Sequence, residues 1–296
     1  MRCLLWRLHR GQLLWTAIVL AVSCAVMALV AQSADRWLAH YEHWQAQLGK
    51  AGCPLPSDGG SFVHAPPPAC QALLSRYSSG KQESFVHAYN FAIPAFEEGL
   101  PLLVVVIGVL VGAPLVAREV EQRTQLVAWT QSVSRRRWYA TKTSILAACL
   151  AFAGLVAGLA NDRVQIPLTR GGLTSSRWIW FFSIDLAPAA EAVLAFALAV
   201  TIGAYLRRTL AAIGAALIGF LALFLLTGWI VRSLTPVSRA TGPRVTPDNS
   251  WGIGGGQYHP AGQYWPLQLI YVAILLLLAA ALLAAGWRAT RPRNIV

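Results

Sequence analysis

The fold of this chain is decided by the stretch from Leu100 to Ala160. Two apolar runs, LPLLVVVIGVLVGAPLVA (residues 100–117) and TSILAACLAFAGLVAGLA (residues 143–160), enclose the polar segment REVEQRTQLVAWTQSVSRRRW (residues 118–138). Each apolar run is long enough to cross about 30 Å of hydrocarbon as an α-helix. The segment between them is compatible with a helix but strongly polar. We therefore expect it to lie in water, at the mouth of two membrane spans.

The composition of the whole chain also indicates a membrane protein. Of the 296 residues, 56% are hydrophobic and only 12% are charged. A soluble globular domain carries about 25% charged residues, so this chain has too little polar surface to stay in water. The net charge of +12 does not indicate a nucleic-acid partner, because the basic residues gather at the ends of apolar runs.

Six apolar runs predict an all-α membrane protein with six transmembrane helices in a single transmembrane domain. The expected spans are residues 13–31, 100–117, 143–160, 186–206, 210–231 and 266–287. Their lengths suit the roughly 17–25 residues that a membrane-spanning helix needs. The first run is too long for the apolar core of a signal peptide, so we interpret it as an uncleaved span.

The basic residues predict the orientation of these spans. More than half of the 24 Lys and Arg residues fall in the N-terminal segment, residues 118–142, the pair Arg207-Arg208 and the C-terminal tail. Because basic residues are enriched on the cytoplasmic side, these four segments are expected there. The protein would then cross the cell (plasma) membrane several times with both termini in the cytoplasm. Residues 32–99 would form a large external loop between spans one and two, in which segments 34–50 and 70–92 are compatible with helix and the Pro/Gly-rich middle is not.

Two cysteines of the expected external loop, Cys53 and Cys70, are candidates for a disulfide. An oxidising exterior permits the bond, and a loop of this length is typically stabilised by about 3 kcal/mol. Neither cysteine belongs to a CxxC arrangement, so a structural role is favoured over a redox role.

Glycines four residues apart predict close contacts between helices. Gly108 and Gly112 form one such pair in the second span, and Gly154 and Gly158 form another in the third. Small residues at this spacing let two helix backbones approach each other.

The usual catalytic and metal-binding patterns are absent from the sequence. There is no GxxxxGK[ST] phosphate loop, no HExxH and no GxSxG, so no catalytic residue is assigned. His40 and His43 would share a helix face but have no third ligand, so we predict no metal site. The glycine-rich stretch 252–256 is interpreted as a flexible turn because no strand is expected before it.

Glu191 is a candidate intramembrane polar site, because an ionisable residue inside a span usually has a function. It lies within about two turns of the expected outer end of its helix. We therefore favour the interpretation that its carboxylate reaches the membrane interface.

The polar segment 118–138 admits two interpretations. Read as a helix, it is amphipathic, and a basic juxtamembrane helix of this kind can lie on anionic lipid. The acidic residues Glu119 and Glu121 favour instead a protein partner with polar contacts.

The same residues carry a resemblance to a known family. The string GAPLVAREVE (residues 112–121), followed by WTQSVSR (residues 129–135), resembles the permease subunits of actinobacterial type-2 ABC exporters. Residues 196–210 and 258–268 are similar to the same family. The resemblance covers most of the chain from about Pro101 onward.

The resemblance implies six spans, an amphipathic coupling helix after the second span, and a cytosolic ABC ATPase supplied by a separate chain. It also implies a pair of permeases in the lipid bilayer, expected here as a homodimer. ATP and Mg would bind the ATPase, and this chain would bind no cofactor. The residues expected to couple to the ATPase are Glu119, Glu121, Thr124, Trp129, Thr130, Gln131, Ser134 and Arg135.

The predicted function is thus the membrane-spanning subunit of an ATP-driven ABC exporter. Its apolar spans favour an amphipathic substrate, such as a drug, a lipid or a hydrophobic peptide. The alternative is a stand-alone secondary transporter or channel, which would need charged residues deep within the spans, where Glu191 is the candidate. An intramembrane enzyme is a further alternative, which would need His, Asp or Ser clusters at the ends of the spans.

Overall fold

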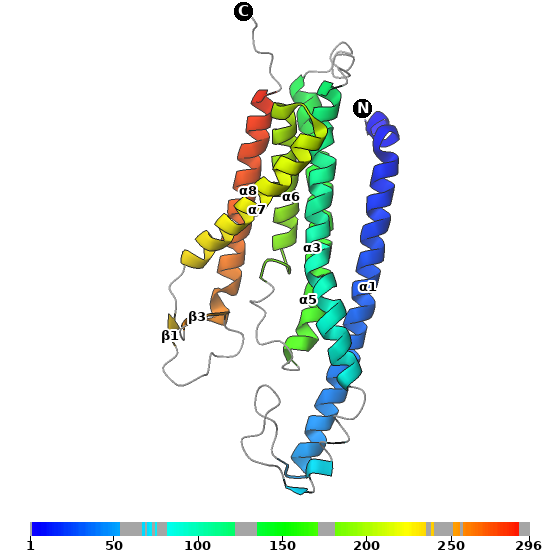
Figure 1. Cartoon of the computed structure of the whole chain (residues 1–296), viewed down its shortest axis with the longest axis vertical. Helices are drawn as coiled ribbons and strands as arrows, with labels where there is room; N and C mark the ends of the chain where they lie inside the picture. Colours follow the sequence, from blue (N-terminus) through cyan, green and yellow to red (C-terminus); the bar gives the residue numbers. More distant parts are fainter. Residues whose placement is uncertain are drawn as a thin grey trace, which may run out of the picture.

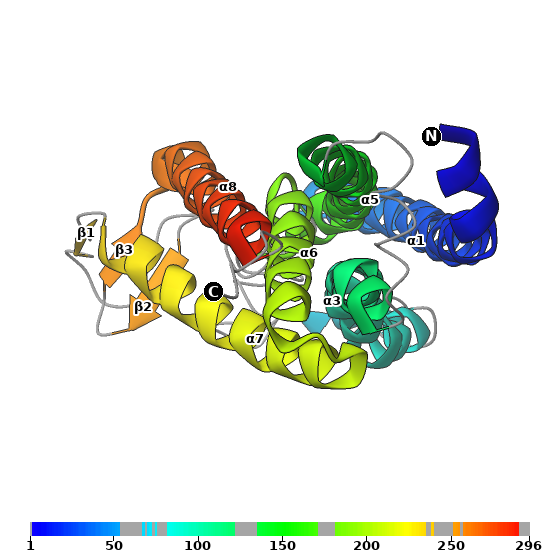
Figure 2. The same cartoon turned by 90° about the horizontal axis from the view of Figure 1, so that it is seen from above.

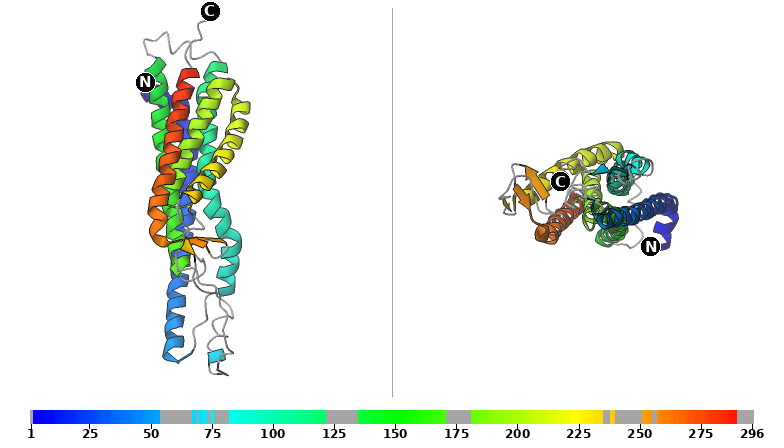
Figure 3. Two further views of the ribbon diagram at one scale, coloured as in Figure 1. Left: turned by 90° about the vertical axis from the view of Figure 1, so that its left-hand side faces the viewer. Right: turned by 90° about the horizontal axis from the view of Figure 1, so that it is seen from below.

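The computed structural model describes residues 2–53, 67–68, 70–72, 75, 82–121, 135–170, 181–234, 238–239, 251–254 and 257–289. They form an elongated bundle of helices (Figures 1 and 3). The helices are α1 (Arg2–Lys50), α3 (Gln82–Glu121), α5 (Arg135–Arg170), α6 (Ala187–Leu206), α7 (Thr209–Ser233) and α8 (Tyr264–Ala289). The expected helical class is confirmed for this part of the chain.

A small antiparallel sheet lies in the chain between α7 and α8. Its strands are β1 (Ser238–Arg239), β2 (Trp251–Gly254) and β3 (Gln257–His259), in the order β1-β3-β2. The expectation of a flexible turn at 252–256 is therefore wrong for residues 252–254, which belong to β2. The pairing of β2 with β3 is irregular between Gly252 and Gly254. Glycine fits such an irregularity because it has no Cβ to restrict the backbone.

Five helices of the described residues are long and apolar enough to cross a membrane. They are residues Gly99–Arg118, Arg137–Ile166, Ala187–Leu206, Thr209–Ser233 and Tyr264–Ala289. These contain or largely overlap the expected second to sixth spans. The expected first span, residues 13–31, lies within α1, where many side chains fall outside the described part, so this first span stays a prediction.

Three helices extend well beyond the spans. α1 has 49 residues, which corresponds to about 70 Å of helix, more than twice the thickness of the hydrocarbon core. α3 begins at Gln82, and α5 continues to Arg170. Much of the segment expected as a loop, residues 32–99, is therefore helix.

The two ends of the bundle differ in charge. The start of α1, the end of α8 and the α6–α7 turn lie at the same end, at the top of Figure 1. Exposed basic residues mark this basic end: Arg118, Arg137, Arg207, Arg208 and Arg288. The opposite end, at the bottom of the figure, holds the disulfide and is named the disulfide end.

α6 is the central helix of the bundle. It contacts α3, α5, α7 and α8, and most of its residues are buried (Figure 2). Its sequence, APAAEAVLAFALAVTIGAYL, is apolar on nearly every side, as expected for a helix surrounded by other helices. Pro188 lies in its first turn, where no backbone hydrogen bond is lost.

The glycine pairs bring two helices against the α6 region, as the spacing predicts. A Cβ on Gly108 would lie 2.9 Å from the carbonyl oxygen of Ala192, and one on Gly112 would lie 2.8 Å from that of Phe196. A Cβ on Gly154 would lie 2.6 Å from Cα of Ala189. One on Gly158 would collide with the carbonyl oxygen of Asp185, just before α6. Any side chain larger than hydrogen would force these backbones apart.

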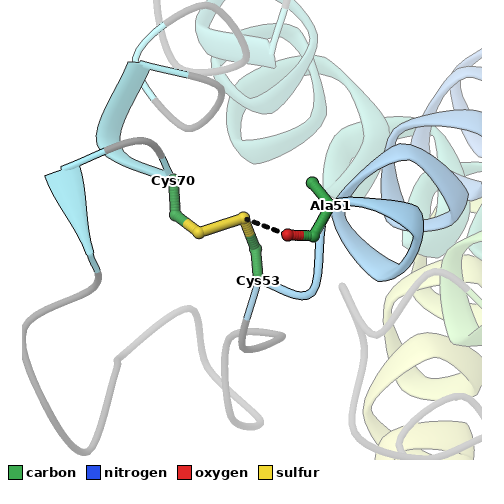
Figure 4. The surroundings of a disulfide bond; sticks show 3 residues. All are labelled: Ala51, Cys53 and Cys70. Atoms are coloured by element: carbon green, nitrogen blue, oxygen red, sulfur yellow. Dashed lines mark hydrogen bonds between the residues drawn. A yellow bond between two sulfur atoms is a disulfide. The ribbon is translucent and has the colours of Figure 1, made fainter.

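The Cys53–Cys70 disulfide is present at the disulfide end (Figure 4). The Cα atoms of the two residues are 5.7 Å apart, a typical separation for a disulfide. Gly52, with φ of 65°, ends α1, and the amide of Cys53 donates to the carbonyl of Leu48. This glycine-terminated helix end turns Cys53 back toward its partner. The disulfide packs against Trp44 and Leu48.

We predict that Gly158→Ala lowers the stability of the protein by about 2 kcal/mol, because the new methyl group collides with backbone that cannot rotate away. Helix propensity alone would favour alanine by about 1 kcal/mol. The matched control is Gly214→Ala in α7, where nothing lies within 4 Å of the added Cβ. Thermal unfolding in detergent should show a lower Tm for the first variant alone. Equal Tm values would contradict the close contact.

We also predict that Cys53 and Cys70 are linked to each other in the mature protein. A non-reduced proteolytic digest should contain the linked peptide pair, identified by mass spectrometry. The same digest after reduction and alkylation is the control and should release the two peptides separately. Two free thiols in protein recovered under oxidising conditions would contradict the disulfide.

Candidate functional site

Those expected coupling residues that the structure describes lie at or beside the basic end. Arg118 and Glu121 belong to the last turn of α3 and are exposed. The carboxylate of Glu121 accepts a hydrogen bond of 3.1 Å from the hydroxyl of Thr209, the first residue of α7. The end of α3 is thereby joined to the α6–α7 turn. Glu121 remains exposed, so a partner can still reach its carboxylate.

The other expected coupling residues are placed only in part. Glu119 lies in the last turn of α3, and Arg135 is the first residue of α5. Thr124, Trp129, Thr130, Gln131 and Ser134 lie outside the described residues. The segment 122–134 connects two helix ends that both lie at the basic end (Figure 1). Its helical structure and its contacts stay predictions.

The connection between α6 and α7 brings two cations beside this surface. Arg207 has a φ of 54°, and its amide donates to the carbonyl of Gly203, which ends α6. Arg208 is extended and precedes α7 directly. A residue with a Cβ adopts positive φ rarely, so this tight turn is held by its surroundings. Both arginines are exposed next to Thr209.

A second group of candidate residues lies buried where α8 meets the start of α6. This polar cluster consists of Asp185, Glu191, Tyr264, Gln268 and Tyr271, all buried. The hydroxyl of Tyr264 donates to Asp185 at 2.7 Å, and that of Tyr271 donates to Glu191 at 2.8 Å. Between these bonds, the side-chain amide of Gln268 donates to the carbonyl of Ile184 at 3.1 Å.

The spacing of the α8 residues explains how the cluster forms. Positions 264, 268 and 271 follow the i, i+4, i+7 pattern and lie on one face of a helix. That face meets the segment 184–191, which leads into α6 and forms its first turns. Since no water is available inside a bilayer, each buried polar group needs such a partner.

Glu191 lies buried inside the bundle, and the expected reach of its carboxylate to the membrane interface stays a prediction. Only 4% of its surface is exposed, and its carboxylate accepts the bond from Tyr271. The reason is that α8 covers it from the side. Sequence reasoning identified Glu191 but missed Asp185, which precedes the apolar run. The polar residues on one face of α8 were the feature of the sequence that could have indicated a buried polar partner for this helix.

Aromatic rings gather around Tyr271, the hydrogen-bond partner of Glu191. The ring of Tyr271 lies 5.1 Å from that of Phe182 and 5.9 Å from that of Phe181. Phe182 also contacts Phe224 of α7, with ring centroids 5.2 Å apart. Edge-to-face arrangements of this kind stabilise a packed aromatic cluster.

Near the basic end, α8 is held by two further hydrogen bonds. The hydroxyl of Tyr139 in α5 donates to the carbonyl of Leu283 at 2.9 Å, and that of Thr201 in α6 donates to Leu282 at 2.7 Å. Gly286 leaves room for both, since its Cβ would lie 2.7 Å from the Tyr139 hydroxyl oxygen. α8 is therefore fixed to neighbouring helices at both of its ends.

The chemistry of these groups suits binding and positioning. Within the described ranges, no group of three or more His, Cys, Asp and Glu residues is placed to hold a metal ion. The recorded contacts of the polar cluster join carboxylates to phenols and an amide to a carbonyl. Such contacts hold two carboxyl groups inside a helical bundle.

Comparison with known proteins identifies the family to which the chain belongs. No curated protein and no solved structure matches the chain. The model of the family described as ABC-2 membrane transporter related matches residues 17–232. The match runs from the expected first span to the end of α7 and includes the whole polar segment 118–138. Because it covers most of the sequence, this multi-pass membrane chain belongs to the ABC-2 membrane transporter related family.

Proposed function

We propose that the chain is the permease subunit of an ATP-driven ABC exporter and works with a separate cytosolic ATPase. The family match over residues 17–232 carries this proposal, because it spans both the apolar helices and the segment between α3 and α5. The sequence has no GxxxxGK[ST] phosphate loop, so ATP and Mg would bind the ATPase. We also propose that the substrate is amphipathic and that two copies of this chain form a homodimer.

In this proposal the basic end faces the cytoplasm. Arg118, Arg137, the Arg207–Arg208 pair and Arg288 lie there, as the positive-inside rule requires. The Cys53–Cys70 disulfide at the opposite end fits an oxidising exterior. Both termini would be cytoplasmic, and the helical extensions of α1 and α3 would project outside the cell.

The segment 118–135 would be the coupling surface for the ATPase. It links the end of α3 to the start of α5, and both helices contact α6. Movement of this segment would therefore act on the central helix from two sides. The Glu121–Thr209 hydrogen bond adds α7 to the group of helices that the ATPase would move.

The orientation can be tested with single introduced cysteines. We expect a cysteine at position 135 to be protected from a membrane-impermeant thiol reagent in intact cells, and one at position 42 to be labelled. The physical reason is the concentration of arginines at the basic end, which holds that end in the cytoplasm. The native cysteines are replaced by serine in the parent used for labelling. External labelling at position 135 would overturn the orientation.

The coupling surface can be tested with paired substitutions. We expect Trp129→Ala and Glu121→Arg to weaken association with the ATPase by tens-fold, because a few central residues carry most of the energy of an interface. Loss of an aromatic anchor typically costs about 2 kcal/mol or more. Arg136→Ala is the matched control in the same segment and should have a much smaller effect. The measurement is a pull-down of the ATPase, with ATP turnover in reconstituted membranes.

The opposite result in this experiment would contradict the proposed role of the segment in coupling to the ATPase. If the Trp129 and Glu121 variants retained the ATPase and its turnover while the Arg136 variant lost them, the segment would be a lipid anchor. Anionic lipid binds basic residues through charge alone and does not require the tryptophan or the glutamate.

A further inference from the structure

Among the described residues, no cation is recorded in contact with Glu191, although a buried carboxylate normally has one nearby. Its recorded contact among the described residues is the hydrogen bond from Tyr271. α6 contains no Lys or Arg, and the one such residue of α8, Arg288, lies at the basic end. Arg232 of α7 lies over the ring of Phe182, with no recorded contact to Glu191. An anion inside a membrane bundle is costly unless a cation or several donors offset it. The carboxylate is therefore short of a partner.

Gln268 supplies a second acceptor that lacks a partner. Its side chain is fully buried, and its amide nitrogen donates to Ile184. Its amide oxygen is buried without a hydrogen-bond partner. Along α8, Gln268 lies between Tyr264 and Tyr271, whose hydroxyls both bind carboxylates. A buried acceptor left unsatisfied is unfavourable, so a ligand that meets it is favoured.

The aromatic rings beside Glu191 provide surfaces that attract cations. Phe181, Phe182 and Tyr271 form a contiguous group, and Phe182 and Phe224 are only half-buried. The guanidinium carbon of Arg232 lies 5.9 Å from the centre of the Phe182 ring. One ring of the group thus already lies beside a cation. A ring face attracts an organic cation by its quadrupole, most strongly where water is excluded.

α7 lies beside this group of aromatic rings, since its Phe224 contacts Phe182. Figures 1 and 2 show α7 running obliquely across the bundle, away from α3 and toward the strands. It is mostly exposed, and its outer side is apolar, with Ile218, Leu225 and Trp229 among its exposed residues. Thr227, on its inner side, lies beside the hydroxyl of Tyr271. An amphiphile dissolved in the bilayer would reach the half-buried rings from this side.

We propose that Glu191, Gln268 and the rings of Phe181, Phe182 and Tyr271 form a binding site for the charged head of a lipophilic organic cation. The Glu191 carboxylate supplies the opposite charge, and the Gln268 amide oxygen adds the negative end of its dipole. The rings surround the head, and the apolar tail stays among the side chains of α7 and α8. This proposal rests on the proposed transport function and assigns a substrate class to it.

The test compares two probes of nearly the same shape and opposite charge, tetraphenylphosphonium and tetraphenylborate. Binding of each is measured to the purified full chain in lipid nanodiscs, with empty nanodiscs as background. Glu191→Gln removes the charge but keeps an oxygen for Tyr271, so its fold should be retained. We expect it to weaken tetraphenylphosphonium binding about tenfold or more and to leave tetraphenylborate binding unchanged. Glu42→Gln, an exposed carboxylate on α1, is the matched control and should bind both probes like the parent.

Three results would overturn the site: no tetraphenylphosphonium binding by the parent, parental affinity in Glu191→Gln, or equal losses for the two probes. If Glu191→Gln does not fold, as judged by its Tm and gel-filtration profile, Phe182→Leu replaces it under the same criteria. The assay contains no ATPase, so its outcome is independent of the coupling test. A chain that binds the cation through Glu191 but retains no ATPase would refute the ATP-driven exporter and leave the cation site in place.

Discussion

The close approach of α3 and α5 to the α6 region is the contact on which the rest of the bundle depends. In a bilayer, burying apolar side chains gains little, because lipid tails are as apolar as leucine. Helices associate there through van der Waals contact, which requires short distances. Gly108 and Gly112 on α3, and Gly154 and Gly158 on α5, provide these distances by placing backbone against backbone. α6 is buried as a result, and α7 and α8 pack on the sides that remain.

The polar contacts of α8 follow from the same setting. Buried hydroxyl, amide and carboxylate groups cannot turn to water, so they bind one another. At one end of α8, Tyr264, Gln268 and Tyr271 bind the segment leading into α6 and its first turns. At the other end, Tyr139 and Thr201 bind carbonyls of α8 itself. α8 is therefore a rigid connection between the basic end and the buried carboxylates.

This arrangement gives the proposed transport function a mechanical basis. The ends of α3 and α8, the start of α5 and the α6–α7 turn all lie at the basic end (Figure 1). A partner acting on the segment 122–134 would move α3 and α5, and the glycine contacts would pass that movement to α6. Since Glu191 is in α6 and Tyr271 is in α8, a shift between these helices would alter the hydrogen bond that joins them. The coupling surface and the polar cluster would in this way respond to each other.

Much of the architecture could be predicted from the sequence because membrane spans depend on local composition. Long apolar runs, basic residues at their ends, and glycines four residues apart are all visible in the chain itself. The Cys53–Cys70 pairing was predictable for a similar reason, since the two cysteines share one expected external segment. The helical extension of α1 was expected over residues 34–50, and that of α3 in part, because these polar stretches remain compatible with helix and the Pro/Gly-rich stretch between them is not. The strand at 251–254 was missed because its partner, β3, cannot be recognised from so short a segment.

The sequence by itself determined the membrane class, five of the expected spans, the close helix contacts at the glycine pairs and the resemblance to a transporter permease. The tertiary structure alone decided that α6 is central and that Glu191 is buried against Tyr271. It also decided that Asp185 binds Tyr264 and that Gln268 binds the carbonyl of Ile184. The physical reason is that hydropathy measures how a residue partitions between water and lipid. Hydrogen bonds between residues some 80 positions apart depend instead on which helix faces meet, and the side chains of several helices set that together.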